Sequence, residues 1–238
     1  YFDTRRGPLR DARVRRALNH AVDYDMLGRS LWGAAFRRMA ALQIPAFGDL
    51  YDADRQGFAY DPDRSRRLLR EAGYRGEEMI IRIAPNYYLQ MLQAVQVIQQ
   101  MWAAVGVATK LETRENLSSL TQPGADIRPT SIAFRFPDPL GGGLAVHLSR
   151  EYSLQQSGFW QPVRFNEIVD ALRLATDAAE RKRLWLALLD EFAEVFEAAA
   201  AQGIPTRVLH GDVPDGLPYG AQAMSAIRGL VGAGQVVV

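Results

Sequence analysis

The segment from residue 77 to residue 113 constrains the fold most, because strand and helix patterns alternate within it. Met79, Ile81 and Ile83 occupy every second position, which is typical of a strand with a buried face. An amphipathic helix is predicted from about Leu89 until Gly106, and residues 107–113 alternate again. A strand, a helix and a strand within roughly 35 residues form a βαβ unit, so we expect parallel strands, a right-handed crossover and an α/β fold.

The N-terminal residues 8–33 predict two short helices joined by a tight corner. Asp11 and Asp23 can each accept hydrogen bonds from the free amides of a first helical turn, and Gly33 offers a left-handed stop. In the first helix, apolar residues at helical spacing predict one buried face: Val14, Leu18, Ala21 and Val22. Arginines are expected on its other faces: Arg13, Arg15 and Arg16.

Three further helices are predicted from their start signals. Residues 61–73 open with Asp-Pro, a cap followed by the position where proline is tolerated, and close with glycine. Asn166 and Asp177 are expected to cap two helices near the C-terminal end of the regular pattern.

The connections are long and rich in turn residues. Residues 34–60 have no sustained period and predict a surface excursion, and residues 114–130 predict a polar connection. Residues 131–136 are a candidate third strand, and the periodicity fails after residue 203.

Charge and composition exclude several classes of function. The 28 basic and 27 acidic residues leave a net charge of +1, so the chain lacks the positive field that nucleic acid or an anionic membrane would require. The absence of cysteine excludes disulfides and thiolate chemistry. No apolar run approaches the roughly 18 residues of a membrane-spanning helix, and the first residues do not show the charged-then-apolar pattern of a secretory leader. Because the chain opens without methionine in what looks like the middle of a strand, we expect a fragment of a longer protein.

Motifs of catalysis are missing as well. His20, His147 and His210 are scattered without metal-ligand spacing, and no Gly-x-Ser-x-Gly elbow is present. The glycines at 141–143 lack the lysine of a phosphate-binding loop. We therefore expect no enzyme, no metal and no cofactor.

Three stretches resemble one protein family when they are taken together in order and spacing. They are PLRDARVRRALNHAVDYDML (8–27), YDPDRSRRLLREAGY (60–74) and VIQQMWAAVGVATKLET (97–113). They resemble the family 5 extracellular solute-binding proteins of peptide, opine and nickel ABC importers. The resemblance covers residues 1 to about 197 and implies the C-terminal lobe of a type II periplasmic-binding-protein-like fold, α/β with a small mixed sheet flanked by helices. It implies a lobe over residues 1–200, followed by an atypical extension over 201–238 that is a hinge return or an edge strand.

In that family the ligand lies between two lobes, and this lobe contributes loops at strand ends. The resemblance places Asn86, Tyr87 and Tyr88 at the ligand, where a tyrosine offers contact area and one hydrogen bond. The alternative is that these tyrosines only cover the start of the following helix.

The second implied ligand loop contains Phe134, Arg135, Phe136 and Asp138. In dipeptide binders of the family an aspartate that binds the free amine of the peptide aligns with Arg135, so the sign of the charge is reversed here. If Arg135 faces the cleft, its fork favours a carboxylate or phosphate on the ligand. The alternatives are that Arg135 pairs with a local acid and that Asp138 binds amides of its own turn.

The resemblance implies the substrate-binding component of an ABC importer, which binds a peptide-like or opine-like solute and delivers it to permease subunits in the membrane. It implies a periplasmic or extracytoplasmic, membrane-associated protein, monomeric when full length, with a small-molecule or peptide ligand and no nucleic acid. Two alternatives stay open: the ligand-sensing domain of a transcription regulator, and an orphan lobe kept as an interaction module.

Overall fold

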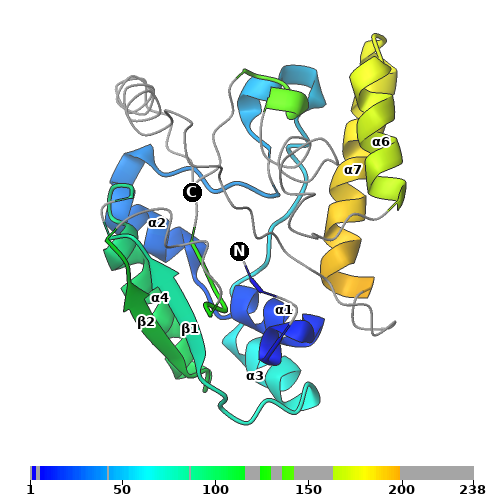
Figure 1. Ribbon diagram of the computed structural model, residues 1–238. Helices are drawn as coiled ribbons and strands as arrows, with labels where there is room; N and C mark the ends of the chain where they lie inside the picture. The colour runs from blue at the N-terminus through cyan, green and yellow to red at the C-terminus, as the bar shows by residue number, and fades with distance from the viewer. Residues whose placement is uncertain are drawn as a thin grey trace.

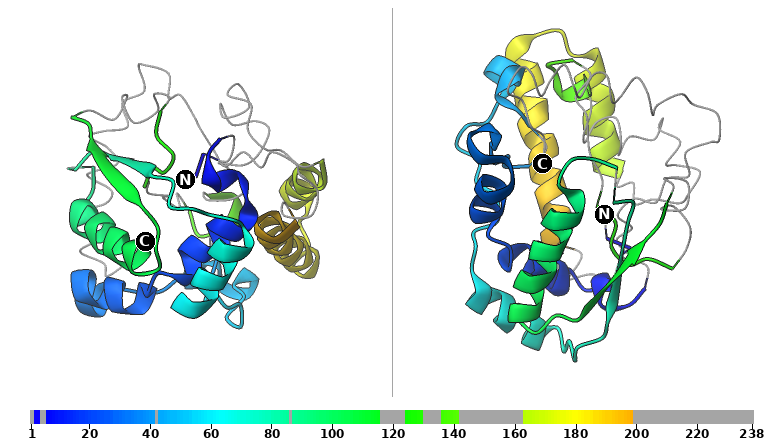
Figure 2. Two further views of the ribbon diagram at one scale, coloured as in Figure 1. Left: turned by 90° about the horizontal axis from the view of Figure 1, so that it is seen from below. Right: turned by 90° about the vertical axis from the view of Figure 1, so that its left-hand side faces the viewer.

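The computed structural model describes residues 2–3, 6–41, 43–85, 87–115, 124–129, 136–141 and 163–198, and the following concerns those residues (Figures 1 and 2). The α-helices are α1 (Ala12–His20), α2 (Tyr24–Trp32), α3 (Pro62–Glu71), α4 (Met91–Ala104), α6 (Val163–Leu174) and α7 (Ala178–Ala198). The strands are β1 (Met79–Ile83) and β2 (Thr109–Thr113), and the short 3₁₀ helices are η1 (Pro8–Arg10), η2 (Gly33–Ala35), η3 (Pro45–Leu50) and η5 (Pro139–Gly141). Figure 1 shows the two strands and α4 on one side, α1 and α3 packed together beneath, and the α6–α7 pair on the other side.

The sheet is small and mixed. β1 pairs with β2 in parallel, from Met79 opposite Thr109 to Ile83 opposite Thr113, which confirms the predicted βαβ unit. On its other side β1 meets Ile127 in a parallel bridge, and Phe2 bridges Ile127 in the antiparallel sense. The pairing next to β1 thus begins inside residues 114–130, which were predicted to be only a connection, whereas residues 131–135 of the candidate third strand lie outside the described residues.

Both faces of β1 are covered. Met79, Ile81 and Ile83 are buried on one face, as their alternation predicts. On the other face Arg82 is 3% exposed and forms an ion pair with Glu112, directly opposite on β2, at 3.0 Å. Strands that are buried on both faces usually consist of consecutive apolar residues. β1 does not, because its second face carries the charged Arg82, whose charge is neutralised by Glu112.

Four aspartates cap the helices that the sequence predicts. Each carboxylate accepts a backbone N–H of the first turn: Asp11 from Arg13 (2.7 Å), Asp23 from Met26 (2.9 Å), Asp61 from Arg64 (2.7 Å) and Asp177 from Glu180 (2.8 Å). Such a cap is worth about 1 kcal/mol. Asn166 is not a cap, because α6 begins at Val163 and Asn166 lies buried within its first turns.

The main hydrophobic core joins α1, α2, α3 and α4 to β1. Its buried members include Leu9, Val14, Leu18, Leu27, Leu69, Met79, Ile81, Ile83, Met91, Val95 and Trp102. Two side chains donate to carbonyls near the end of α1, where helical carbonyls run out of backbone donors. The Ala17 carbonyl also accepts the Ala21 N–H at 3.0 Å. The Trp102 indole N–H donates to the Leu18 carbonyl at 2.9 Å, and the Ser65 hydroxyl donates to the Ala17 carbonyl at 2.8 Å. These bonds fix α3 and α4 against α1.

A second core lies between η3 and the α6–α7 pair. Its buried members are Phe47, Phe165, Val169, Leu172, Leu184, Trp185, Leu188 and Leu189. Residues 34–60 are therefore more than a surface excursion, because Phe47 is 4% exposed and packs edge-on against Trp185 at 5.8 Å between ring centroids. The side chain of Gln43 closes this loop by bonding both backbone groups of Asp52.

Arg15 departs from the expectation for the first helix. It is 1% exposed, although its position off the apolar stripe predicted a place outside the core. One of its terminal nitrogens donates to the carbonyls of Leu9 and Arg10, and burial lowers the pKa of the Arg15 guanidinium to about 10. The carbonyls of η1 thus hold this charge inside the protein.

Candidate functional site

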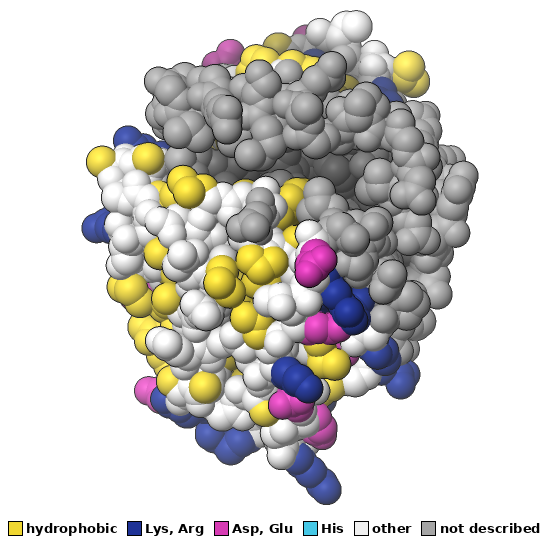
Figure 3. All heavy atoms as spheres, turned by 60° about the vertical axis from the view of Figure 1, so that its left-hand side comes forward, with side chains coloured by type: hydrophobic (Ala, Val, Ile, Leu, Met, Phe, Trp, Pro, Cys, Tyr) yellow, Lys and Arg dark blue, Asp and Glu magenta, His cyan; other side chains and the backbone are white. Residues whose placement is uncertain are grey.

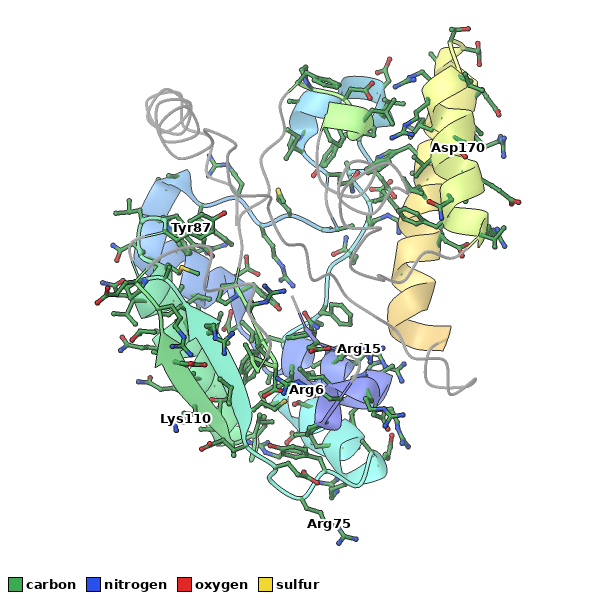
Figure 4. All side chains as sticks on the ribbon, viewed as in Figure 1. Arg6, Arg15, Arg75, Tyr87, Lys110 and Asp170 are labelled. Atoms are coloured by element: carbon green, nitrogen blue, oxygen red, sulfur yellow. The ribbon has the colours of Figure 1, made fainter. Side chains whose placement is uncertain are left out.

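The first candidate ligand loop follows the carboxyl end of β1. The chain turns sharply there, because the Tyr87 N–H donates to the Ala84 carbonyl at 3.0 Å. Figure 4 shows Tyr87 at the end of the lobe where α2 also ends. Asn86, which the sequence places in the same loop, lies outside the described residues.

The rings of Tyr87 and Tyr88 lie against each other. Their ring centroids are 5.2 Å apart with planes at 53°, and both rings are half-buried against the main core. Burial raises the pKa of Tyr88 to about 12, with a smaller contribution from Tyr87. Like any tyrosine hydroxyl, it is protonated at neutral pH and can donate a hydrogen bond. The pair can therefore offer aromatic area to a solute, and the Tyr88 carbonyl accepts the Met91 N–H at the start of α4.

The same loop presents a residue that the sequence patterns did not mark. Leu89, expected at the start of the helix, precedes α4, which begins at Met91, and its side chain is 73% exposed. Gln90 adopts φ 64°, the left-handed conformation that is uncommon for residues other than glycine. Strained backbone of this kind tends to cluster at binding sites. An apolar residue at a helix start is normally expected to pack against the core. The sequence therefore gives no sign that Leu89 is exposed while neighbouring apolar residues are buried.

The second candidate loop is described only in part. Phe134 and Arg135 lie outside the described residues, while Phe136 is 51% exposed. Asp138 accepts a hydrogen bond from the Leu140 N–H at 2.9 Å and forms an ion pair with Arg181 of α7 at 2.5 Å. These contacts agree with the alternative in which Asp138 stabilises its own turn.

The two loops therefore rest on different parts of the protein. Tyr87 and Tyr88 pack on the main core, whereas Leu140, two residues after Asp138, packs on the second core.

In the second loop the backbone at Gly141 comes very close to Phe136. A Cβ at Gly141 would lie 2.3 Å from the Phe136 carbonyl oxygen. Only glycine fits there, which accounts for at least one of the three successive glycines.

The described residues contain no cluster of metal-binding side chains, and on the face around β2 they show no large patch of one charge. Figure 3 shows acidic and basic side chains interspersed on the face around β2, without a large field of one sign. Among the described residues, no three His, Asp or Glu side chains gather where they could hold a metal ion. Likewise, no helix in these residues combines the length and the apolar character needed to cross a membrane.

Comparison with known proteins identifies the family. Residues 1–145 match the family described as bacterial extracellular solute-binding proteins, family 5 Middle. The chain is 31% identical over 118 residues to the dipeptide-binding protein of Escherichia coli, a match that covers 48% of this chain and 22% of that protein. It is equally 31% identical over 118 residues to the heme-binding protein A of Haemophilus influenzae, covering 48% and 21% of the two chains.

The fold matches solved structures over most of the described chain. The periplasmic binding protein DppA of Helicobacter pylori, solved with the peptide STSA, superposes with a TM-score of 0.69 at 20% identity, covering 84% of this chain and 39% of that one. The expected α/β fold of type II periplasmic binding proteins, with a small mixed sheet flanked by helices, is confirmed. The matched residues span about a fifth of the length of these two curated relatives. It belongs to the bacterial extracellular solute-binding proteins of family 5.

Proposed function

We propose that this chain is the C-terminal lobe of the substrate-binding component of an ABC importer. The lobe would bind a peptide-like or opine-like solute together with a second lobe and deliver it to a membrane permease. The observation that carries this proposal is the tyrosine pair at the carboxyl end of β1, because strand ends of α/β sheets are the usual place for ligands. The names of the relatives, which refer to dipeptides and heme, support a small organic ligand.

Solute binding would depend on closure of the two lobes around the solute. Contacts from both lobes to one solute exist only in the closed arrangement, so the solute shifts the population toward that state. Tyr87 and Tyr88 would supply aromatic area and a hydroxyl donor from this lobe, and Asn86, Phe134 and Phe136 are proposed as further ligand contacts. A lobe alone offers half of the contacts, so we expect the 238-residue chain to bind its solute very weakly, and submicromolar affinity would contradict the proposal.

Isothermal titration of the complete gene product with a dipeptide, a tripeptide and an opine tests the role of the tyrosines. We expect Tyr87→Ala to weaken the best ligand at least about tenfold, which is the typical loss for an aromatic contact of about 1.4 kcal/mol. Tyr60→Ala is the matched control, because Tyr60 is 51% exposed and lies outside the loop. Equal affinity of the two variants would remove Tyr87 from the site.

The ligand would carry an anionic group if Arg135 faces the cleft, because a guanidinium grips a carboxylate or phosphate with two hydrogen bonds. Titration with matched anionic and cationic solutes tests this. If the protein prefers a ligand that carries only an amine, and Arg135→Ala does not change the affinity for that ligand, the proposal of an anionic ligand is wrong. Asp138 is proposed to hold the turn that presents Arg135.

The location and partners follow from the same proposal. The protein would be periplasmic or extracytoplasmic and membrane-associated, monomeric when full length, would contact permease subunits, and would use no nucleic acid, cofactor or catalytic group. Residues 1–200 would form the lobe and residues 201–238 an extension. None of the relatives named above is a regulator. Reading the open frame upstream of Tyr1 tests the regulator alternative: a secretory leader or lipobox supports transport, whereas a helix-turn-helix would support regulation.

A further inference from the structure

A hollow of about 580 Å³ lies where α2 ends and the chain turns through η2. Its lining includes Asp25, Arg29, Phe36, Arg37 and Arg38. None of these residues belongs to the two candidate ligand loops. The volume falls in the range of small-molecule sites.

The charges of the hollow do not balance. Three guanidiniums face one carboxylate, that of Asp25, which pairs with Arg38 at 2.9 Å. Arg38 is further held by the Phe58 carbonyl and lies over the Tyr24 ring at 5.6 Å from its centroid. Two positive charges that line the same hollow, those of Arg29 and Arg37, are thus left without an acidic partner among the described residues.

The two remaining arginines differ in how they are held. Arg37 donates through Nη1 to the carbonyls of Ala34 and Phe36, at 2.6 and 2.8 Å. Its Nε and Nη2 have no acceptor within the described part of the chain. Arg29 is exposed and makes no hydrogen bond or ion pair with any described residue. Arg37 is therefore fixed with donors to spare, and Arg29 is free to close on a ligand.

The hollow also has an apolar, closely packed lining residue, Phe36. Phe36 is 8% exposed, and its ring lies so close to Gly28 that a Cβ there would be 2.2 Å from the nearest ring carbon. Packing of this ring fixes the backbone from which Arg37 and Arg38 project. A ligand with both an anionic and an apolar group could therefore place its apolar group against Phe36 and its anionic group near the guanidiniums, since all of them line the same hollow.

Arginines near the end of a helix can serve structure alone, by bonding the last carbonyls and opposing the helix dipole. That role accounts for Nη1 of Arg37 but not for its other donors or for Arg29. A guanidinium fork matches the two oxygens of a carboxylate or phosphate, and excess positive charge favours such a partner. We infer that this hollow binds a small organic anion, with its carboxylate or phosphate held by Arg37 and Arg29 and its apolar part beside Phe36. The site lies within this chain alone and does not depend on lobe closure or on the proposed transport function.

Titration of the ¹⁵N-labelled 238-residue chain, followed through the arginine Nε–H signals, tests this inference. The probes are phenyl phosphate, phenylacetate and the neutral 2-phenylethanol, all at constant ionic strength. We expect saturable binding of an anion and none of the alcohol at the same concentrations. Saturation by phenyl phosphate only, or by phenylacetate only, would identify the preferred oxyanion.

The variants locate the site. We expect Arg37→Gln to raise the dissociation constant of the anion about tenfold or more, since it removes charge-assisted hydrogen bonds. Arg67→Gln is the matched control, because Arg67 is exposed on α3 and has no partner among the described residues. Arg29→Gln changes an exposed side chain without internal bonds, so it tests the site even if Arg37→Gln impairs folding. Binding that neither variant weakens, or that the alcohol matches, would overturn the inference.

Discussion

Replacing Trp102 by phenylalanine tests how α4 is fixed to α1. The Trp102 side chain is 6% exposed, and its indole N–H reaches the Leu18 carbonyl at 2.9 Å. That carbonyl is among the last four of α1 and has no partner within the helix. Phenylalanine leaves it buried and without this donor, which costs about 1–3 kcal/mol. The smaller ring leaves a void that costs about 1 kcal/mol more. We therefore expect the free energy of unfolding to fall by about 2–4 kcal/mol.

Urea denaturation followed by far-ultraviolet circular dichroism measures this loss without relying on tryptophan fluorescence, which the change itself alters. Trp32→Phe is the matched control, because Trp32 is half-buried at the end of α2 and its indole makes no hydrogen bond with the described residues. We expect the control to lose less than about 1 kcal/mol, as most substitutions away from buried bonds do. A loss for Trp102→Phe no larger than that of the control would refute the reasoning, because water would then serve the Leu18 carbonyl as well as the indole does.

Three further changes follow from the same structure. Gly28→Ala should lower the free energy of unfolding by about 1–3 kcal/mol in urea denaturation, because its Cβ meets the Phe36 ring, whereas Gly57→Ala, whose Cβ would meet side-chain atoms at 3.5 Å, should change it little. Asp61→Ala should cost about 1 kcal/mol through the lost cap of α3, and no change in midpoint would contradict that role. Burial raises the pKa of Tyr88 from 10.0 to about 12, so the unfolded chain releases this proton first and stability should fall as pH rises from 10 to 12. Tyr88→Phe should reduce this loss of unfolding free energy between pH 10 and pH 12, measured by urea denaturation at each pH. An equal loss in the variant and the unchanged protein would contradict the raised pKa of Tyr88.

The family signature and the local elements could be predicted because they depend on nearby residues. Each aspartate cap lies two or three residues from the amide it accepts, so the cap is visible in the sequence itself. The alternation around Ile81 and the period of α4 likewise arise from repeated local geometry, and together they imply parallel pairing through the handedness of the connection. Asn166 was misplaced because a capping residue type also occurs within a first turn, where burial decides its role.

What only the tertiary structure decided depends on how separate elements pack against one another. Phe47 becomes core because Trp185 covers it, and Arg15 can be buried because η1 offers its carbonyls. The hollow beside α2 is lined by residues of α2, of η2 and of the turn that follows, where Phe36 packs on Gly28. A periodic pattern records which side of an element is apolar, but it does not record which distant side chain arrives to cover or neutralise it. For that reason the sequence by itself determined the family, the βαβ unit and the tyrosine loop. The second core came from long-range packing, and the buried arginine and the arginine-lined hollow came from the way successive elements fold back on one another.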